Sequence, residues 1–368
     1  MQLSTSSPFD IIVRQGYGLN AGAISGIERF NSFPIPEKRK QGYVENMHRD
    51  LFDAEDEGRK LSEEVKNTIR ERLLPYYVRG SKIAKYNQKI YRYAGLLVYA
   101  FSAMAVASVA LGTIIHGLSP YAFSFELLLL LAILCIVYYA HRRHTHKNWI
   151  ENRFLTERIR SAIFFAACGV EASPIEVPPY MGIAHSPDDW MVKAFNEIWN
   201  RLPKMKGCHG ESCRPLIDFI RKSWVQDQIE YHEWRSEKVG KISHALERSG
   251  IVIFVLAVVA AFSHVILSFM GHHLINVEWI EHSLTFAAIA LPATGAAIGG
   301  IRLHREYTRL EKRSKNMITI LKQLDERLSR TVKPEDFESL LREMEELMLR
   351  ETQDWLMLMK FTELEAAA

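Results

Sequence analysis

The sequence is poor in cysteine and contains none of the compact motifs that are typical of enzymes. Its 368 residues include four cysteines, Cys135, Cys168, Cys208 and Cys213. So few cysteines indicate a reducing compartment and argue against structural disulfides. The sequence also lacks a Walker loop, a nucleophile elbow, a His-Glu-x-x-His pattern and a pair of catalytic carboxylates. We therefore expect no enzymatic activity and no cofactor.

Neither sign of charge dominates, and we expect no secretory leader. Lys and Arg number 46 and Asp and Glu 43, which leaves a net charge of +3 at pH 7. This balance indicates no particular partner, and we expect no nucleic acid among the partners. The first ~90 residues contain no apolar run behind a basic start, so membrane insertion is expected to use the first hairpin described below.

Four long apolar runs are present, although a mean hydropathy of −0.08 conceals them. They cover residues 94–115, 122–140, 250–270 and 280–301. A helix of about 20 apolar residues crosses the hydrocarbon core of a bilayer. The sequence therefore predicts an all-α integral membrane protein with four transmembrane helices in two hairpins. Long helical extensions on the cytoplasmic side are expected to form a helical bundle.

The distribution of basic residues predicts the orientation of these helices. The turns within the hairpins, residues 116–121 and 271–279, contain no Lys or Arg, whereas all four outer flanks are rich in both. Basic residues are retained on the cytoplasmic side of membranes. Both termini and the central segment 141–249 are therefore predicted to be cytoplasmic.

The basic residues before the two hairpins follow the same spacing, which favours a duplicated two-helix module over chance. Arg79, Lys82 and Arg92 precede the first hairpin, and Arg235, Lys238 and Arg248 precede the second. The two copies would be related by an axis along the membrane normal. These six residues and Arg302 are our candidates for cytoplasmic gating or anchoring. They could bind anionic lipid headgroups or serve only to fix the topology.

The chain divides into five predicted regions. Residues 1–60 are expected to form a flexible arm. Residues 61–140 contain a cytoplasmic helix, capped by Ser62 and ending before Pro75, and the first hairpin. Residues 141–249 form a cytoplasmic helical region, and residues 250–301 form the second hairpin. In the last region, 302–368, one helix continues the fourth span to Arg330 and another begins at Pro334.

Three carboxylates near the turn ends of the hairpins are candidates for an ion path. Glu126 lies in the second apolar run, and Glu278 and Glu281 begin the fourth. Such residues are costly in a membrane and could ring the mouth of a pore made by several subunits, where they would favour cations. The alternative is that they extend to the headgroup region without a role in conduction.

Two further groups of residues have both a functional and a structural interpretation. Pro292, Thr294, Gly295, Gly299 and Gly300 could line a pore or permit close helix packing, and the two roles are compatible. Cys208, His209 and Cys213 could supply three metal ligands, but no second Cys/His pair completes a tetrahedral site. We therefore expect no bound metal.

Several short patterns resemble one family of bacterial membrane proteins. They include the segment 27–31, the residues Trp149, Arg153, Glu157 and Arg160 after the second span, and Trp224, Asp227, Gln228 and Tyr231 before the third. Tyr77, Gly80, Ala84, Tyr86, Tyr91 and Arg92 complete the likeness. The chain resembles the membrane part of SLOG-associated, SLATT-type transmembrane effectors of conflict and antiviral systems. The resemblance implies an effector that compromises or depolarises the bacterial inner membrane after a nucleotide-type signal.

The resemblance departs from the family pattern at the N-terminus. Too few residues precede Ile27 for a sensor domain, so we expect a separate cytoplasmic sensor protein or a nucleotide signal sensed by another route. Our interpretation is an oligomeric, multi-pass inner-membrane protein that forms or gates a pore. The alternatives are a non-conducting membrane anchor that recruits a cytoplasmic partner, and an ion transporter.

Overall fold

The described part of the protein is almost entirely helical and contains no strand. The computed structural model describes residues 11, 21–52, 61–170, 190–203, 214–270, 278–330 and 334–360. Within these ranges four helices are long and apolar enough to cross a membrane. In chain order, the chain itself buries only 28%, 17%, 11% and 11% of their apolar windows. The all-α class and the four candidate transmembrane helices are thus confirmed.

The chain separates into two compact units. The first, which we term the bundle unit, comprises Met1–Asn87, Lys147–Glu233 and Asn316–Phe361. The second, termed the hairpin unit, comprises Gln88–His146, Trp234–Lys315 and Thr362–Ala368. Helices α5 (Leu74–Ile114), α7 (Thr145–Cys168), α10 (Asp227–Met270) and α12 (Tyr307–Arg330) contribute residues to both units.

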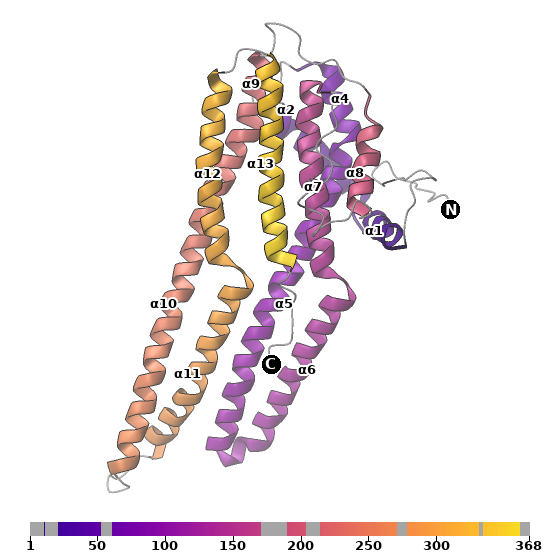
Figure 1. The fold of residues 1–368 in the computed structure, drawn as a ribbon. Helices are drawn as coiled ribbons and strands as arrows, with labels where there is room; N and C mark the ends of the chain where they lie inside the picture. Colours follow the sequence, from indigo (N-terminus) through magenta and orange to yellow (C-terminus); the bar gives the residue numbers. More distant parts are fainter. Residues whose placement is uncertain are drawn as a thin grey trace. The chain divides into compact units, whose positions relative to one another are not determined.

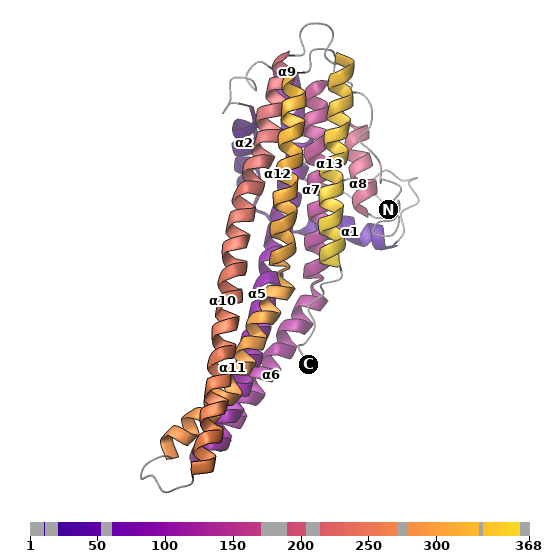
Figure 2. The same ribbon diagram turned by 60° about the vertical axis from the view of Figure 1, so that its left-hand side comes forward.

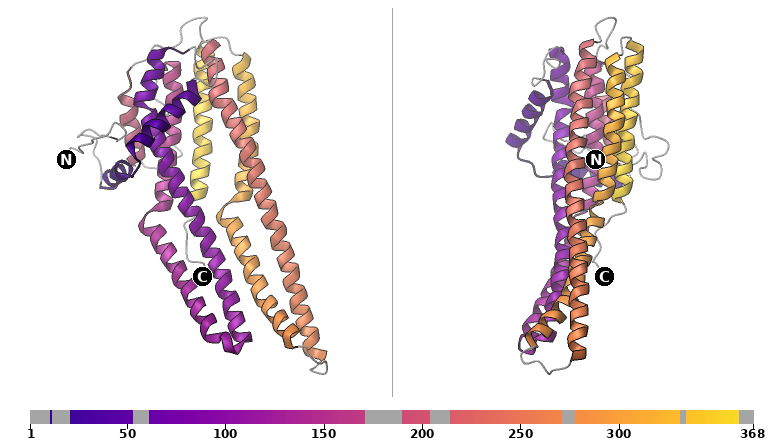
Figure 3. Two further views of the ribbon diagram at one scale, coloured as in Figure 1. Left: turned by 180° about the vertical axis from the view of Figure 1, so that it is seen from behind. Right: turned by 90° about the vertical axis from the view of Figure 1, so that its left-hand side faces the viewer.

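The hairpin unit contains two helical hairpins, which Figures 1 and 3 show from opposite sides. Helix α5 is followed by α6 (Ser119–Arg142), and α10 is followed by α11 (Glu278–His304). The first hairpin is closed by side chains that reach across it: Ser108 Oγ donates to the Ala122 carbonyl at 2.7 Å, and Ser119 Oγ donates to Gly112 at 2.6 Å. Such hydroxyl contacts suit an apolar setting, where polar backbone groups need internal partners.

Each hairpin ends in a bend of the same construction. Between α6 and α7 (Thr145–Cys168), the amide of Arg143 donates to Tyr139 and that of His144 donates to His141. Between α11 and α12, Arg305 donates to Ile301 and Glu306 donates to Leu303. His144 and Glu306 both have φ of 49°, in the left-handed region. The uninterrupted helix predicted from the fourth span to Arg330 is therefore broken at residues 305–306.

The bundle unit is assembled from shorter helices and parts of α5, α10 and α12. Its other elements are α1 (Ala21–Ser32), α2 (Glu37–Phe52), α4 (Glu63–Arg72), most of α7, α8 (Trp190–Asn200), α9 (Arg214–Ile220), a π-helix η4 (Arg221–Gln226) and α13 (Pro334–Lys360). Helices α12 and α13 lie side by side in Figure 2, and Arg327 of α12 pairs with Glu343 of α13 at 2.5 Å. In the core, Phe164 stacks on Trp224 with ring centroids 4.5 Å apart.

The N-terminal part of the chain is more ordered than the sequence indicates. Residues 21–52, which fall in the predicted flexible arm, form α1 and α2, and Phe30 and Phe52 are buried. In contrast, the predicted cap of the next helix is present, since Ser62 Oγ accepts from the Val65 amide at 3.3 Å. Helix α4 ends at Arg72, just before Pro75, as the sequence predicts.

Candidate functional site

The three candidate carboxylates lie on α6 and α11 near the turns of the hairpins. Glu126 and Glu281 are half-buried, and Glu278 is exposed. Within the described ranges, no hydrogen bond or ion pair engages their side chains. In one chain, therefore, no described hydrogen bond or ion pair joins Glu126 to Glu281.

A polar pair inside the second hairpin lies closer to the middle of the apolar segments. Thr285 Oγ1 is 3.1 Å from Nε2 of His264, which links α11 to α10. Thr285 also donates to the Glu281 carbonyl at 2.8 Å. The sequence shows His264 within an apolar run, but its partner lies 21 residues away and is not identified by any local pattern. The contact provides a specific interhelical bond in the apolar part of the hairpin.

Within the small-residue segment of α11, the three glycines differ in how closely other helices approach them. A Cβ on Gly299 would meet nothing within 4 Å, and one on Gly295 would meet only Ile253, at 3.7 Å. The next residue, Gly300, lies under the ring of Tyr99 from α5, where a Cβ would overlap the ring. Helix α11 passes through Pro292 without a break, and Thr294 Oγ1 donates to Ala290 at 2.8 Å. Close packing of α11 on α5 thus depends on Gly300.

Two of the candidate gating cations have structural roles in the bundle unit. Arg79 of α5 is 1% exposed, and its side chain lies at the C-terminal end of α1. Its guanidinium donates to the carbonyls of Phe30 at 2.7 Å and Phe33 at 3.3 Å, and also contacts that of Asn31. A cation at a helix C-terminus binds the last carbonyl groups and stabilises the helix dipole. Lys82 lies over the Tyr43 ring, 3.4 Å from its centroid, and so holds α2 against α5.

The basic residues around the second hairpin differ in their surroundings. Arg302 donates to Glu247 at 2.9 Å and to Ser243 at 3.4 Å, which joins α11 to α10. Lys238 lies over the Trp234 ring at 4.6 Å. Arg235 is half-buried, whereas Arg248 is exposed, and no contact to a described residue engages its side chain. Among these basic residues, Arg302 is the one whose described contacts join the two helices of this hairpin.

Sequence reasoning missed a cluster of aromatic and basic residues at the base of the hairpins, which we term the Tyr91 junction: Tyr91, Arg92, His146, His304 and Arg305. Tyr91 is buried between two imidazole rings, with centroids 4.7 Å from His146 and 4.8 Å from His304. Arg305 Nη2 donates to the Arg92 carbonyl at 2.7 Å. The residues come from α5, the start of α7 and the α11–α12 bend, so no single window of sequence contains the cluster.

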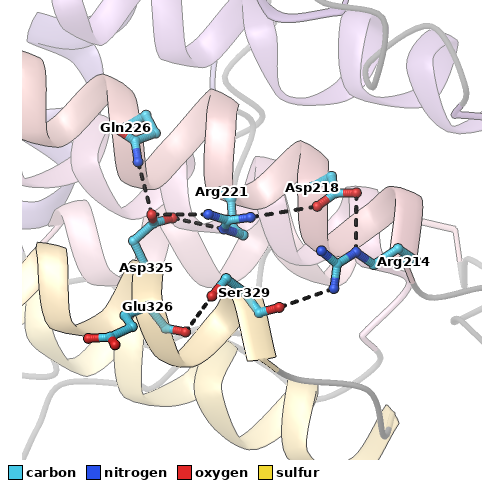
Figure 4. Close-up of polar contacts among 7 residues, drawn as sticks. All are labelled: Arg214, Asp218, Arg221, Gln226, Asp325, Glu326 and Ser329. Atoms are coloured by element: carbon cyan, nitrogen blue, oxygen red, sulfur yellow. Dashed lines mark hydrogen bonds and ion pairs between the residues drawn. The ribbon is translucent and has the colours of Figure 1, made fainter.

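A second polar cluster, shown in Figure 4, joins α9 and η4 to α12 within the bundle unit. Arg221 binds Asp325 through two hydrogen bonds, at 2.9 and 3.1 Å, and Gln226 donates to the same carboxylate at 3.0 Å. Arg214 donates to the Ser329 carbonyl at 3.1 Å. The hydrogen bonds that Arg221 donates to the Asp325 carboxylate raise the pKa of Arg221. We term this contact the Asp325 clasp.

The described residues do not include a metal centre. No group of three or more His, Cys, Asp or Glu residues in these ranges could hold a metal ion. Cys208, His209 and Cys213 lie outside the described residues. Burial raises the pKa of the Cys168 thiol, which favours its inert, protonated form.

Comparison with known proteins adds no family to this geometry: no protein-family model, curated protein or solved structure matches the chain.

Proposed function

We propose that the chain is one subunit of an oligomeric effector that forms or gates a pore in the bacterial inner membrane. The observation that carries the proposal is the way in which each hairpin is connected. Each one is entered by a continuous helix, α5 of 41 residues or α10 of 44 residues, and is left through a bend. A straight helix transmits a tilt or rotation along its length, whereas a bend absorbs it. A cytoplasmic signal can thus reach the spans through α5 and α10.

The second hairpin is buried very little by its own chain, which supports assembly of several copies. Its two apolar windows are 11% buried by the chain itself, which leaves their faces for lipid or other subunits. In a ring of subunits, half-buried Glu126 and Glu281 would lie near the mouth of the lumen and favour cations. The exposed face of α11 that contains Gly299 would be available for contact with a neighbour.

The proposed orientation places both termini and the bundle unit in the cytoplasm. It rests on the positive-inside distribution of Lys and Arg. The proposed duplication is supported by the matched bends, since the same two hydrogen bonds and the same left-handed φ follow both hairpins. The bundle unit would then receive the trigger, either a separate sensor protein or a nucleotide-type signal, as the resemblance to SLATT-type effectors of antiviral systems implies.

A non-conducting membrane anchor is the second candidate. It is favoured by the fact that, among the described residues of one chain, no hydrogen bond or ion pair joins Glu126 to Glu281. In this case the bundle unit would bind a cytoplasmic partner, and the hairpins would only hold it at the membrane.

Purified protein reconstituted in liposomes distinguishes the two candidates. The vesicles carry a potassium gradient and a potential-sensitive dye, and a second set is loaded with a larger fluorescent solute. A pore collapses the potential as protein is added, and Glu126→Gln and Glu281→Gln reduce its preference for cations. Glu64→Gln, an exposed cytoplasmic change, is the control and retains the wild-type preference. In cells carrying the same dye, a silent membrane even with activating partners present would falsify the pore and leave the anchor.

A further inference from the structure

The Tyr91 junction brings together positive charges that no carboxylate of the described chain balances. Among the described residues, no hydrogen bond or ion pair joins Arg92 or Arg305 to Asp or Glu. The neighbouring acid, Glu306, pairs with Arg309 at 3.4 Å. Burial and the nearby Arg92 lower the pKa of Arg305. A partly buried guanidinium in these surroundings is destabilised unless an anion accompanies it.

Two buried nitrogen atoms of the junction also have no hydrogen-bond partner among the described residues. They are Nε of Arg305 and Nε2 of His304. Unsatisfied buried polar atoms cost free energy and are rare in native proteins. The Nε–H group of arginine can only donate, so the missing partner is an acceptor. An acceptor with negative charge satisfies the hydrogen bond and the excess of positive charge together.

The position of the junction indicates the source of such an anion. Arg92 lies two residues before the apolar run 94–115, and Arg305 lies four residues after the run 280–301. Residues at the ends of membrane spans lie at the depth of lipid headgroups. Arginine binds phosphate oxygens through paired, charge-assisted hydrogen bonds. We propose that the Tyr91 junction is a binding site for the phosphate of an anionic phospholipid, held by Arg92 and Arg305.

Such a ligand would stabilise one particular arrangement of helices. Arg92 belongs to α5, and Arg305 belongs to the bend between α11 and α12, where it already donates to the Arg92 carbonyl. A phosphate bound by both guanidinium groups screens their repulsion and fixes the bend against α5. The inference depends on insertion of the hairpins in a membrane, but it does not depend on conduction.

The test is native mass spectrometry of the full-length protein released from detergent, with phosphatidylglycerol or phosphatidylcholine titrated before release. Wild-type protein is expected to retain phosphatidylglycerol in preference to phosphatidylcholine. Arg92→Gln and Arg305→Gln should each weaken retention about tenfold, the effect of losing one charged hydrogen bond. The matched control is Arg248→Gln, which removes an exposed arginine at the corresponding position before the second hairpin.

The outcomes separate the possible explanations. If Arg248→Gln weakens retention as much as the junction variants, the lipid binds to a general basic belt and the proposed site is wrong. If the Arg92→Gln variant retains the lipid fully, the proposed site is also refuted. Arg92 is exposed, so its replacement is not expected to cause a folding defect that would obscure this result. Addition of inorganic phosphate identifies the source. Displacement of the lipid by millimolar phosphate would assign the site to a soluble phosphate-bearing anion. Retention of the lipid in the presence of phosphate supports a phospholipid as the ligand. Because this experiment measures no conductance, failure of the pore proposal would not alter either result.

Discussion

Replacement of Gly300 by alanine should loosen the packing between the two hairpins, whereas the same change at Gly299 should not. The Cβ of an alanine at position 300 would lie 2.7 Å from Cδ1 and 2.9 Å from Cζ of Tyr99, and closer still to Cε1. Carbon atoms at van der Waals contact are 3.5–4.0 Å apart. The ring of Tyr99 or the whole of α11 must therefore move by about 1 Å to accept one methyl group.

The magnitude follows from two opposing effects. Forcing an extra methyl group into a packed interface costs about 1–3 kcal/mol, and the lower half of this range applies here because the ring lies at the end of a rotatable side chain. Replacing glycine by alanine within a helix returns up to about 1 kcal/mol. We expect Gly300→Ala to reduce the free energy of unfolding by about 1 kcal/mol. Gly299→Ala, with nothing within 4 Å, should leave it unchanged or raise it.

Thermal unfolding of the detergent-solubilised full-length protein, followed by circular dichroism, measures both effects. A third variant, Tyr99→Ala, provides the decisive comparison, since Gly300→Ala should cost nothing once the ring is absent. The two changes should therefore show a coupling free energy of about 1–2 kcal/mol, the cost of the overlap with the ring. Equal effects of the alanines at positions 299 and 300, or an additive double variant, would show that Tyr99 does not pack on Gly300.

Three more substitutions test other parts of the structure. Asp325→Asn removes the carboxylate of the Asp325 clasp, a side chain that is 17% exposed. Amide hydrogen exchange in η4 and α12 should accelerate about tenfold. The control Glu326→Gln, at a side chain that is 62% exposed, should have little effect on exchange. Arg79→Met removes the cation that binds the end of α1 and should lower the free energy of unfolding by about 3 kcal/mol. Amide hydrogen exchange should rise first in α1, and unchanged exchange in α1 would contradict the assigned role of Arg79. His144→Gly relieves a left-handed conformation and should raise the free energy of unfolding by about 0.5–1 kcal/mol, measured by thermal denaturation. A lower free energy of unfolding would mean that the His144 side chain stabilises the bend.

The elements that the sequence predicts correctly are those determined by local chemistry. Apolar runs of span length locate the four candidate transmembrane helices, because length and composition are sufficient for that inference. The Ser62 cap and the end of α4 before Pro75 also depend on neighbouring residues alone. No comparable signal marks the break at Arg305 and Glu306, since both residue types favour helices and neither glycine nor proline is present.

The candidate sites and the N-terminal helices could not be predicted because they depend on contacts between distant residues. Helix α1 is stabilised by Arg79, which lies 49 residues beyond the Phe30 carbonyl that it binds. The Tyr91 junction likewise requires residues 91, 146 and 304 to meet. The spacing of basic residues identified Arg79 and Arg92 as important but could not distinguish their environments. One is a buried helix cap, and the other is an exposed cation beside Arg305.

The two bends have the same backbone geometry, but different contacts hold them, and this difference matters for any signal that reaches the spans. A left-handed conformation at a residue other than glycine costs roughly 1–2 kcal/mol, so each bend needs compensating contacts. At the first bend, Thr145 Oγ1 donates to the Ala140 carbonyl at 3.2 Å, within the chain segment that bends. At the second, Arg305 donates to Arg92 of another helix. The first bend is therefore stabilised locally, whereas the second depends on how α5 and α11 pack. A change of Arg305 should accordingly alter the second bend, whereas a change of Tyr91 should affect both bends, because its ring also lies against His146 beside the first.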